Sequence, residues 1–187
     1  MVLTEIVKEL ETAPDRGAGV PISQVRKWMI SEDTDILGAT YGFLSNDGQV
    51  NRVSPPLEFD EVFDFMLRYY EFCLRTDPKS QWANSRYSAG WDLAGWFAQM
   101  WDEKRDTKYF QAIKAMLEKL YISADPELKA CIEQAIVEQL FERKPIRKFF
   151  ENWAHSPQLR PAYDAAALWV SRGGTSPLTK PRAPKPG

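Results

Sequence analysis

Few residues in this chain have the chemistry that catalysis needs. The one histidine, His155, lies at the end of an expected helix, where a positive side chain favours the last carbonyl groups. Cys73 and Cys131 lie on apolar stripes, as buried free cysteines usually do. The sequence contains no HExxH, CxxC or EF-hand pattern. It therefore predicts no catalytic residue, no metal site and no cofactor, and it favours a protein that is not an enzyme.

The acidic residues say more about function than the histidine and the cysteines do. Residues 1–106 carry 18 Asp and Glu against 11 Lys and Arg, whereas residues 172–187 carry four basic residues and no acidic one. An acidic surface repels nucleic acid and can steer a basic protein. We expect a basic protein partner to contact Glu32, Asp33, Asp35, Asp47, Glu58, Asp60 and Glu61. The alternatives are an acidic surface that serves solubility alone, and carboxylates that stabilise helix N-termini.

A second candidate site lies in the aromatic segment 81–97, QWANSRYSAGWDLAGWF. Aromatic walls with one charged pair suit a small polar ligand. The candidates for such a ligand pocket, which could also serve an enzyme, are Trp82, Arg86, Tyr87, Trp91 and Asp92. The alternative is ordinary close packing of helices over Gly90 and Gly95. A third hypothesis is a homo-oligomer formed through an exposed aromatic face, since the chain has seven tryptophans.

Helical periodicity runs through nearly all of the sequence and must position these residues. Apolar spacing and capping residues predict helices over 2–12, 31–44, 57–75, 85–104, 108–122, 126–140, 145–154 and 157–172, and a short helical segment over 23–30. Residues 45–56 are expected to be a loop or a brief extended strip. The fold class predicted is all-α, a single-domain irregular bundle of about seven to eight helices.

The predicted domain covers residues 1–172, and residues 173–187 are expected to be a disordered, basic, Pro-rich tail. No apolar run is long enough to span a membrane, and the first residues have no signal-peptide pattern. We therefore expect a cytoplasmic protein without a membrane partner. The basic stretch RKPIRKFF (143–150) fits the solvent-facing side of a core helix, so a nucleic-acid partner is not expected.

From Leu57 to Trp169 the chain resembles a family of uncharacterised small bacterial all-helical proteins. The resemblance is carried by SRYSAGWDLAGWF (85–97), LFERKPIRKFFENW (140–153) and SPQLRPAYDAAALW (156–169). It implies an immunity or accessory protein encoded beside a bacterial toxin, and the basic partner would then be that toxin. The family pattern brings no catalytic residues with it, and residues 1–56 and the tail lie outside it.

Overall fold

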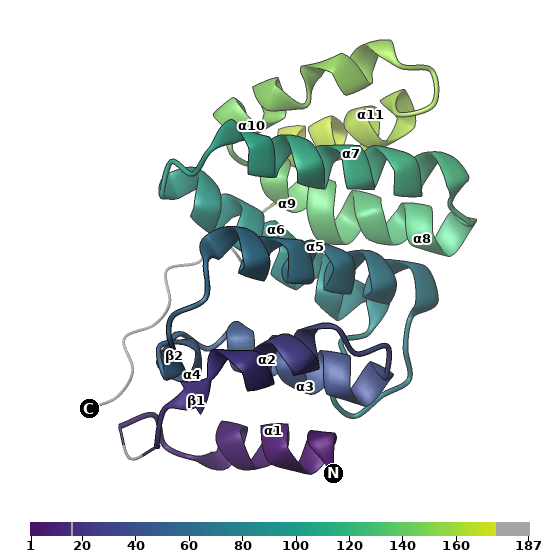
Figure 1. Ribbon diagram of the computed structural model, residues 1–187. Coiled ribbons are helices and arrows are strands. Elements are labelled where there is room, and N and C mark those ends of the chain that lie inside the picture. The colour runs from purple at the N-terminus through teal and green to yellow at the C-terminus, as the bar shows by residue number, and fades with distance from the viewer. Residues whose placement is uncertain (16, 175–187) are drawn as a thin grey trace. The chain divides into compact units, whose positions relative to one another are not determined.

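The computed structural model describes residues 1–15 and 17–174, and it confirms the all-α class (Figure 1). The N-terminal helices are α1 (Val2–Glu11), α2 (Ile22–Met29), α3 (Thr34–Leu44), α4 (Asp47–Val50) and α5 (Phe59–Thr76). The next are α6 (Arg86–Asp102), α7 (Thr107–Ser123), α8 (Pro126–Cys131), α9 (Glu138–Phe141), α10 (Lys144–Phe149) and α11 (Arg160–Ser171). A π-helical segment, η1 (Ile132–Val137), joins α8 to α9, and a 3₁₀ segment, η2 (Glu151–His155), follows α10. The expected disordered tail lies, from residue 175 on, outside the described residues.

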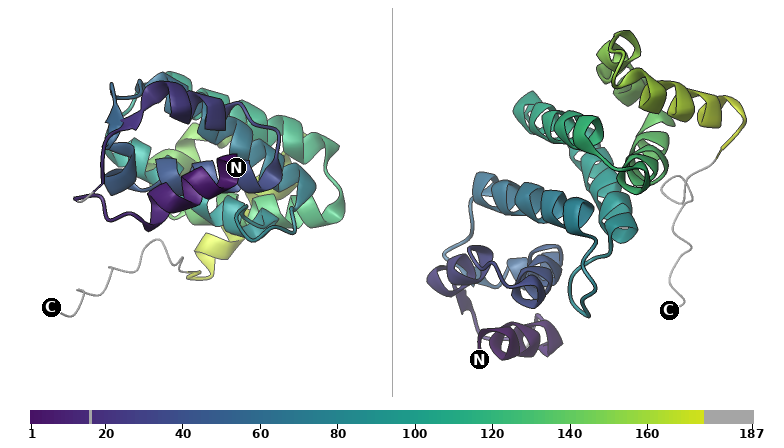
Figure 2. Two further views of the ribbon diagram at one scale, coloured as in Figure 1. Left: turned by 60° about the horizontal axis from the view of Figure 1, so that its bottom comes forward. Right: turned by 90° about the vertical axis from the view of Figure 1, so that its right-hand side faces the viewer.

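Contacts within the chain gather into two compact units, which meet in sequence between Arg86 and Tyr87. In the first unit, α3 packs against α1, α2 and α5. Figure 1 and the right-hand view of Figure 2 show α1, then the α2–α3 pair, then α5 in successive layers of this unit. In the second unit, α11 packs on α9, η1 and η2.

Residues 45–56 are more ordered than the sequence indicates. Asn46 accepts hydrogen bonds from the backbone of Gly48 and Gln49 and so begins the short helix α4. Strand β2 (Val53–Ser54) then pairs in parallel with β1 (Val20–Pro21). The turn residues of this segment do not predict the pairing, because the partner strand lies more than thirty residues earlier in the chain.

The buried side chain of Arg52 links three segments of the first unit. Its side chain is only 7% exposed and pairs with the Glu9 carboxylate. It also donates to the Gln49 Oε1 atom at 2.6 Å and to the Ala18 carbonyl at 2.9 Å. A buried guanidinium is tolerated only when its donors are satisfied, so these contacts fasten α1 and β1 to the segment before β2.

Capping explains which helix boundaries the sequence predicts correctly. Asp106 begins α7 by accepting from the Lys108 backbone at 2.9 Å, and Asp125 begins α8 by accepting from the Leu128 backbone at 2.7 Å, as expected. The helix expected from residue 31 instead begins at Thr34. Its N-cap is Asp33, whose Oδ1 atom reaches two backbone N–H groups at 3.0 Å.

The last two expected helices are also shorter than predicted. The helix expected over 145–154 is divided into α10 and η2. The last helix, expected from residue 157, begins at Arg160 because Ser156 initiates a turn, in which its carbonyl accepts from the Leu159 and Arg160 N–H groups. These departures shift helix ends and leave the fold class unchanged.

The described part of the second unit has an aromatic core that contains the buried cation of Lys114. Rings of Phe97, Trp101, Phe110 and Phe149 contact one another with centroid separations of 5.0–6.5 Å. Lys114 lies 4.7 Å from the Phe149 ring centroid and donates to the Phe149 carbonyl at 2.7 Å. Burial lowers the Lys114 pKa. The lysine therefore ties α7 to the end of α10.

We predict that Arg52→Met lowers the free energy of unfolding by about 3–5 kcal/mol, because Glu9 then loses its buried partner. Urea unfolding followed by circular dichroism measures the change. The matched control is Arg75→Met, which breaks an exposed i,i+4 pair with Glu71 and is expected to cost less than about 1 kcal/mol. Equal losses in the two variants would contradict the role assigned to Arg52.

Candidate functional site

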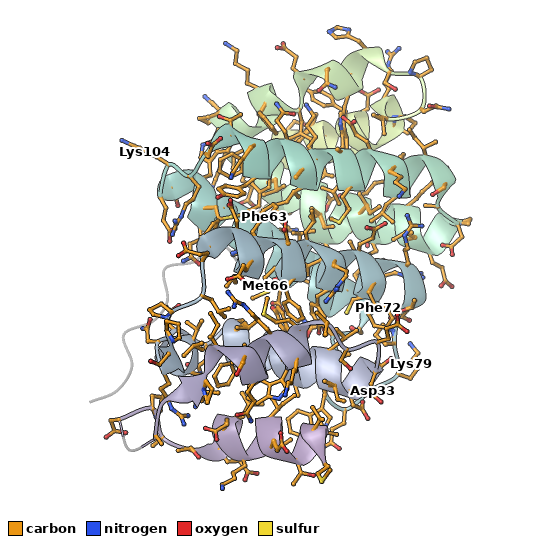
Figure 3. The ribbon with its side chains drawn as sticks, in the orientation of Figure 1. Asp33, Phe63, Met66, Phe72, Lys79 and Lys104 are labelled. Atoms are coloured by element: carbon orange, nitrogen blue, oxygen red, sulfur yellow. The ribbon has the colours of Figure 1, made fainter. Side chains whose placement is uncertain are left out.

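An open pocket of about 440 Å³ lies in the first unit, between the start of α3 and the end of α5. Its lining consists of two carboxylates, one lysine, three hydroxyl side chains and two apolar side chains. These residues are Asp33, Thr34, Asp35, Phe72, Thr76, Pro78, Lys79 and Ser80. Figure 3 shows Asp33, Phe72 and Lys79 at this edge of the unit. We call this feature the acidic pocket.

Hydrogen bonds within the fold position both aspartates, and these bonds involve only one carboxylate oxygen of each residue. The Asp33 Oδ1 atom caps α3, and the Asp35 Oδ1 atom accepts from the Ser80 hydroxyl at 2.6 Å. Within the described part of the chain, the Oδ2 atom of each residue accepts no hydrogen bond. Each carboxylate therefore has one oxygen available for a ligand at the pocket.

The wall opposite α3 is the connection between α5 and α6. Asp77 ends α5 in the left-handed conformation and accepts from the Arg86 backbone at 2.8 Å. Its other oxygen pairs with the Lys79 Nζ atom at 2.6 Å, and the hydrogen bond from Lys79 holds the Asp77 pKa below its usual value. Ser80 in turn accepts from the backbone of Trp82 and Ala83 at 2.9 Å. The connection is thus fixed by its own hydrogen bonds.

A glycine on α3 lets this connection approach the helix. A Cβ atom on Gly38 would lie 2.4 Å from backbone atoms of Trp82 and Ala83, closer than any real Cβ contact. Only glycine fits at this point, and the close approach brings Ser80 within hydrogen-bond distance of Asp35. The pocket depends on this contact.

The seven acidic candidates do not form one patch. Asp33 and Asp35 line the acidic pocket, and Glu32 directly precedes them. Glu58, Asp60 and Glu61 lie at the start of α5, an 18-residue helix about 27 Å long, whereas the pocket is lined by residues of its last turns. Asp47 lies in the first turn of α4.

The carboxylates at the start of α5 have structural partners. Glu58 and Glu61 form a capping box. Glu61 also takes two hydrogen bonds from Arg26, at 2.8 and 3.0 Å, and these bonds lower the Glu61 pKa. The fold therefore uses both oxygens of Glu61, whereas it uses one oxygen each of Asp33 and Asp35.

A ligand pocket built from the aromatic segment needs the Arg86 side chain to face a cavity. Instead the buried Arg86 side chain donates to the carbonyls of Leu74 at 2.8 Å and Arg75 at 3.2 Å, where α5 ends. Trp82 and Arg86 belong to the first unit, whereas Tyr87, Trp91 and Asp92 belong to the second. The Tyr87 hydroxyl reaches Gln134 at 3.5 Å. Arg86 thus has a structural role in capping α5.

The structure shows where the side chains with catalytic chemistry lie. His155 is exposed, and Cys73 and Cys131 are buried free thiols. In residues 1–15 and 17–174 no group of three His, Cys, Asp or Glu side chains is arranged to hold a metal ion. No helix in these same ranges is long and apolar enough to cross a membrane. Trp28 and Trp153 are buried and the other five tryptophans are half-buried, so the homo-oligomer hypothesis stays a prediction.

The sequence pattern identified the two aspartates of the pocket and missed the rest. Phe72, Thr76, Lys79 and Ser80 join the site through contacts between segments about 40 residues apart, which periodicity does not reveal. One local signal was present in the Asp77-Pro78 pair, which ends α5 and starts the connection.

Comparisons of the chain with protein-family models, with curated proteins and with solved structures give no match. The resemblance to small bacterial helical proteins therefore stays a prediction.

We predict opposite effects for alanine at two glycines one turn apart on α3. Gly38→Ala forces backbone of the α5–α6 connection to move and is expected to cost about 1–3 kcal/mol or more. Gly42→Ala meets only Leu10 methyl groups at 3.9 Å and is expected to stabilise the helix by up to about 1 kcal/mol. Thermal unfolding of both variants measures the difference, and stabilisation by Gly38→Ala would contradict the close approach.

We predict that the native thiols are unreactive. Burial raises the pKa of Cys73 from 9.0 to about 11, so at pH 8 its thiolate is a minor form. Ellman's reagent should label both cysteines rapidly only in urea. Since the folded pKa is the higher one, this thiol's contribution to stability should be complete below about pH 9 and be lost as the pH rises through about 11. Rapid labelling of the native protein at pH 8 would contradict this prediction.

Proposed function

We propose that this chain is a non-enzymatic protein-binding protein, and that its acidic pocket receives a basic side chain of a protein partner. The observation that carries the proposal is the pair of unused carboxylate oxygens on Asp33 and Asp35, both at one pocket. Two carboxylates that face one cavity favour a cation over any neutral or anionic group.

The pocket chemistry suits the side chain of an arginine or lysine. A guanidinium has five N–H donors and can bond two carboxylates at once, whereas an ammonium acts as a point charge. Phe72 offers a ring for the cation and its aliphatic stem, and Thr34 and Thr76 add hydroxyl acceptors. Lys79 is already paired with Asp77, so it does not neutralise the two aspartates through a direct contact.

The charge of the first unit supports a basic partner. Residues 1–86 carry 14 Asp and Glu against nine Lys and Arg. Such an excess raises the rate at which a cationic protein meets this surface, while the pocket supplies the specific contact. The resemblance to immunity-type proteins would make that partner a bacterial toxin.

We predict that Asp33→Asn/Asp35→Asn weakens binding of a fluorescent alternating Arg–Gly peptide at least tenfold, as measured by anisotropy at low salt. Asparagine is also a good N-cap, and it keeps an acceptor for Ser80, so the fold is expected to persist. The matched control is Glu5→Gln/Glu11→Gln, which removes two charges from exposed positions on α1.

Equal weakening in both double variants would mean that only net charge acts, and it would contradict a specific pocket. No binding of the Arg–Gly peptide to the unaltered chain would overturn the proposal itself. An alternating Glu–Gly peptide serves as the negative ligand.

A further inference from the structure

A second pocket, of about 390 Å³, lies within the second unit along the C-terminal half of α6. Its lining residues are Gly95, Ala98, Gln99, Asp102, Glu103 and Arg143. Residues 95, 98, 99 and 102 recur at helical spacing and so share one face of α6. We call this feature the α6 pocket.

Small residues give the α6 pocket an apolar floor. Gly95 has no side chain and Ala98 has only a methyl group, so the space beside this face of the helix stays open. The charged lining residues come from the end of α6 and from Arg143, the N-cap residue of α10. Apolar surface lowers the local dielectric constant, so contacts between charges are stronger there than in open water.

Arg143 and Asp102 form an ion pair that leaves part of each group unused. The Arg143 Nη1 atom donates to the Asp102 Oδ1 atom at 2.6 Å and to the Ala98 carbonyl at 3.3 Å. Within residues 1–15 and 17–174, no group accepts from the Arg143 Nε or Nη2 atom, and none donates to the Asp102 Oδ2 atom. The two side chains are 34% and 64% exposed, so a ligand can reach both.

The other polar side chains of the lining bond to neighbours on the same segment. The Gln99 Nε2 atom donates to the Glu103 Oε1 atom at 2.9 Å, and the Arg105 Nε atom donates to the Glu103 Oε2 atom at 3.0 Å. Both oxygens of Glu103 are therefore in use. Arg143 and Asp102 remain as the charged lining groups that a ligand can engage.

We infer that the α6 pocket binds a small zwitterion, an α-amino acid with an apolar side chain. The ligand carboxylate accepts from the Nε and Nη2 atoms of Arg143, a planar edge that matches two carboxylate oxygens. The ligand ammonium donates to the Asp102 Oδ2 atom, and the apolar side chain covers Gly95 and Ala98. Because α6 ends at Asp102, the negative end of its helix dipole also favours the ammonium.

The ion pair selects a ligand that carries both charges. A simple anion at Arg143 lies beside the like charge of Asp102, and a simple cation at Asp102 lies beside the like charge of Arg143. A zwitterion opposes each charge with its opposite. Each end of a peptide carries only one of the two charges, so a free amino acid is the better ligand. This inference concerns the second unit and is independent of the acidic pocket.

The test titrates the full chain with L-leucine and follows the ¹H–¹⁵N spectrum of the backbone amides. We expect saturable shifts of the Gly95, Ala98 and Arg143 amides. Isocaproate lacks the ammonium of leucine and isoamylamine lacks its carboxylate, and we expect each to bind roughly tenfold more weakly or worse. Absence of shifts at these amides up to the solubility limit of leucine would overturn the inference, as would binding of either analogue as tight as that of leucine.

Substitution of Arg143 tests the carboxylate contact. Arg143→Gln, and also Arg143→Lys, which has no planar two-donor edge, are expected to weaken leucine binding roughly tenfold or more. The matched control is Lys148→Gln, which removes a charge from an exposed position on α10 and is expected to leave the affinity unchanged. The exposed Asp102 tolerates loss of its partner, and the amide spectrum of each variant checks that it is folded. Equal affinities in Arg143→Gln and the unaltered chain would contradict the inference.

Substitution of Asp102 separates binding from a purely structural role. Asp102→Asn removes the partner of the ligand ammonium and also the negative charge that repels a simple carboxylate. We therefore expect it to weaken leucine binding and to strengthen isocaproate binding. Equal weakening of both ligands would show that Asp102 only supports the fold, and it would overturn the assigned contact.

Discussion

The close approach of α3 to the α5–α6 connection at Gly38 is the constraint on which the acidic pocket depends. It leaves no room for a Cβ atom and places the connection where Ser80 bonds Asp35. The left-handed Asp77 and the buried Arg86 fix the start and the end of the same connection. Each of these contacts is made within the first unit, so the pocket is a property of that unit alone.

The hydrogen-bond partners of the charged side chains distinguish structural residues from candidate binding residues in this chain. Arg52 and Arg86 are buried, and both donate to backbone carbonyls, which leaves them no role as ligand-binding cations. Glu61 gives both oxygens to Arg26. Asp33 and Asp35 each give only one oxygen to the fold. That difference distinguishes Asp33 and Asp35 from Glu61, and their position in the pocket lining distinguishes them from Glu32 and Asp47.

Much of the fold could be predicted from the sequence, because helix periodicity and capping are local signals. Asp106 and Asp125 illustrate this, since each begins the helix expected of it. The β1–β2 pairing and the Arg52 contacts could not be predicted, because both join segments more than thirty residues apart. Glu58 looked like a binding residue for the same physical reason that makes it an N-cap, since a carboxylate suits either role. The local sequence pattern does not distinguish an N-cap carboxylate from a carboxylate that binds a partner.

The most direct test of the central claim is the carboxyl ¹³C spectrum of the aspartate and glutamate side chains during titration with the Arg–Gly peptide. Guanidinium contact changes the shift of the carboxylate it touches. The account predicts that the Asp33 and Asp35 resonances move together and saturate, while those of Asp47, Glu58 and Glu61 stay in place. Shifts spread evenly over the acidic residues, or confined to the start of α5, would contradict it.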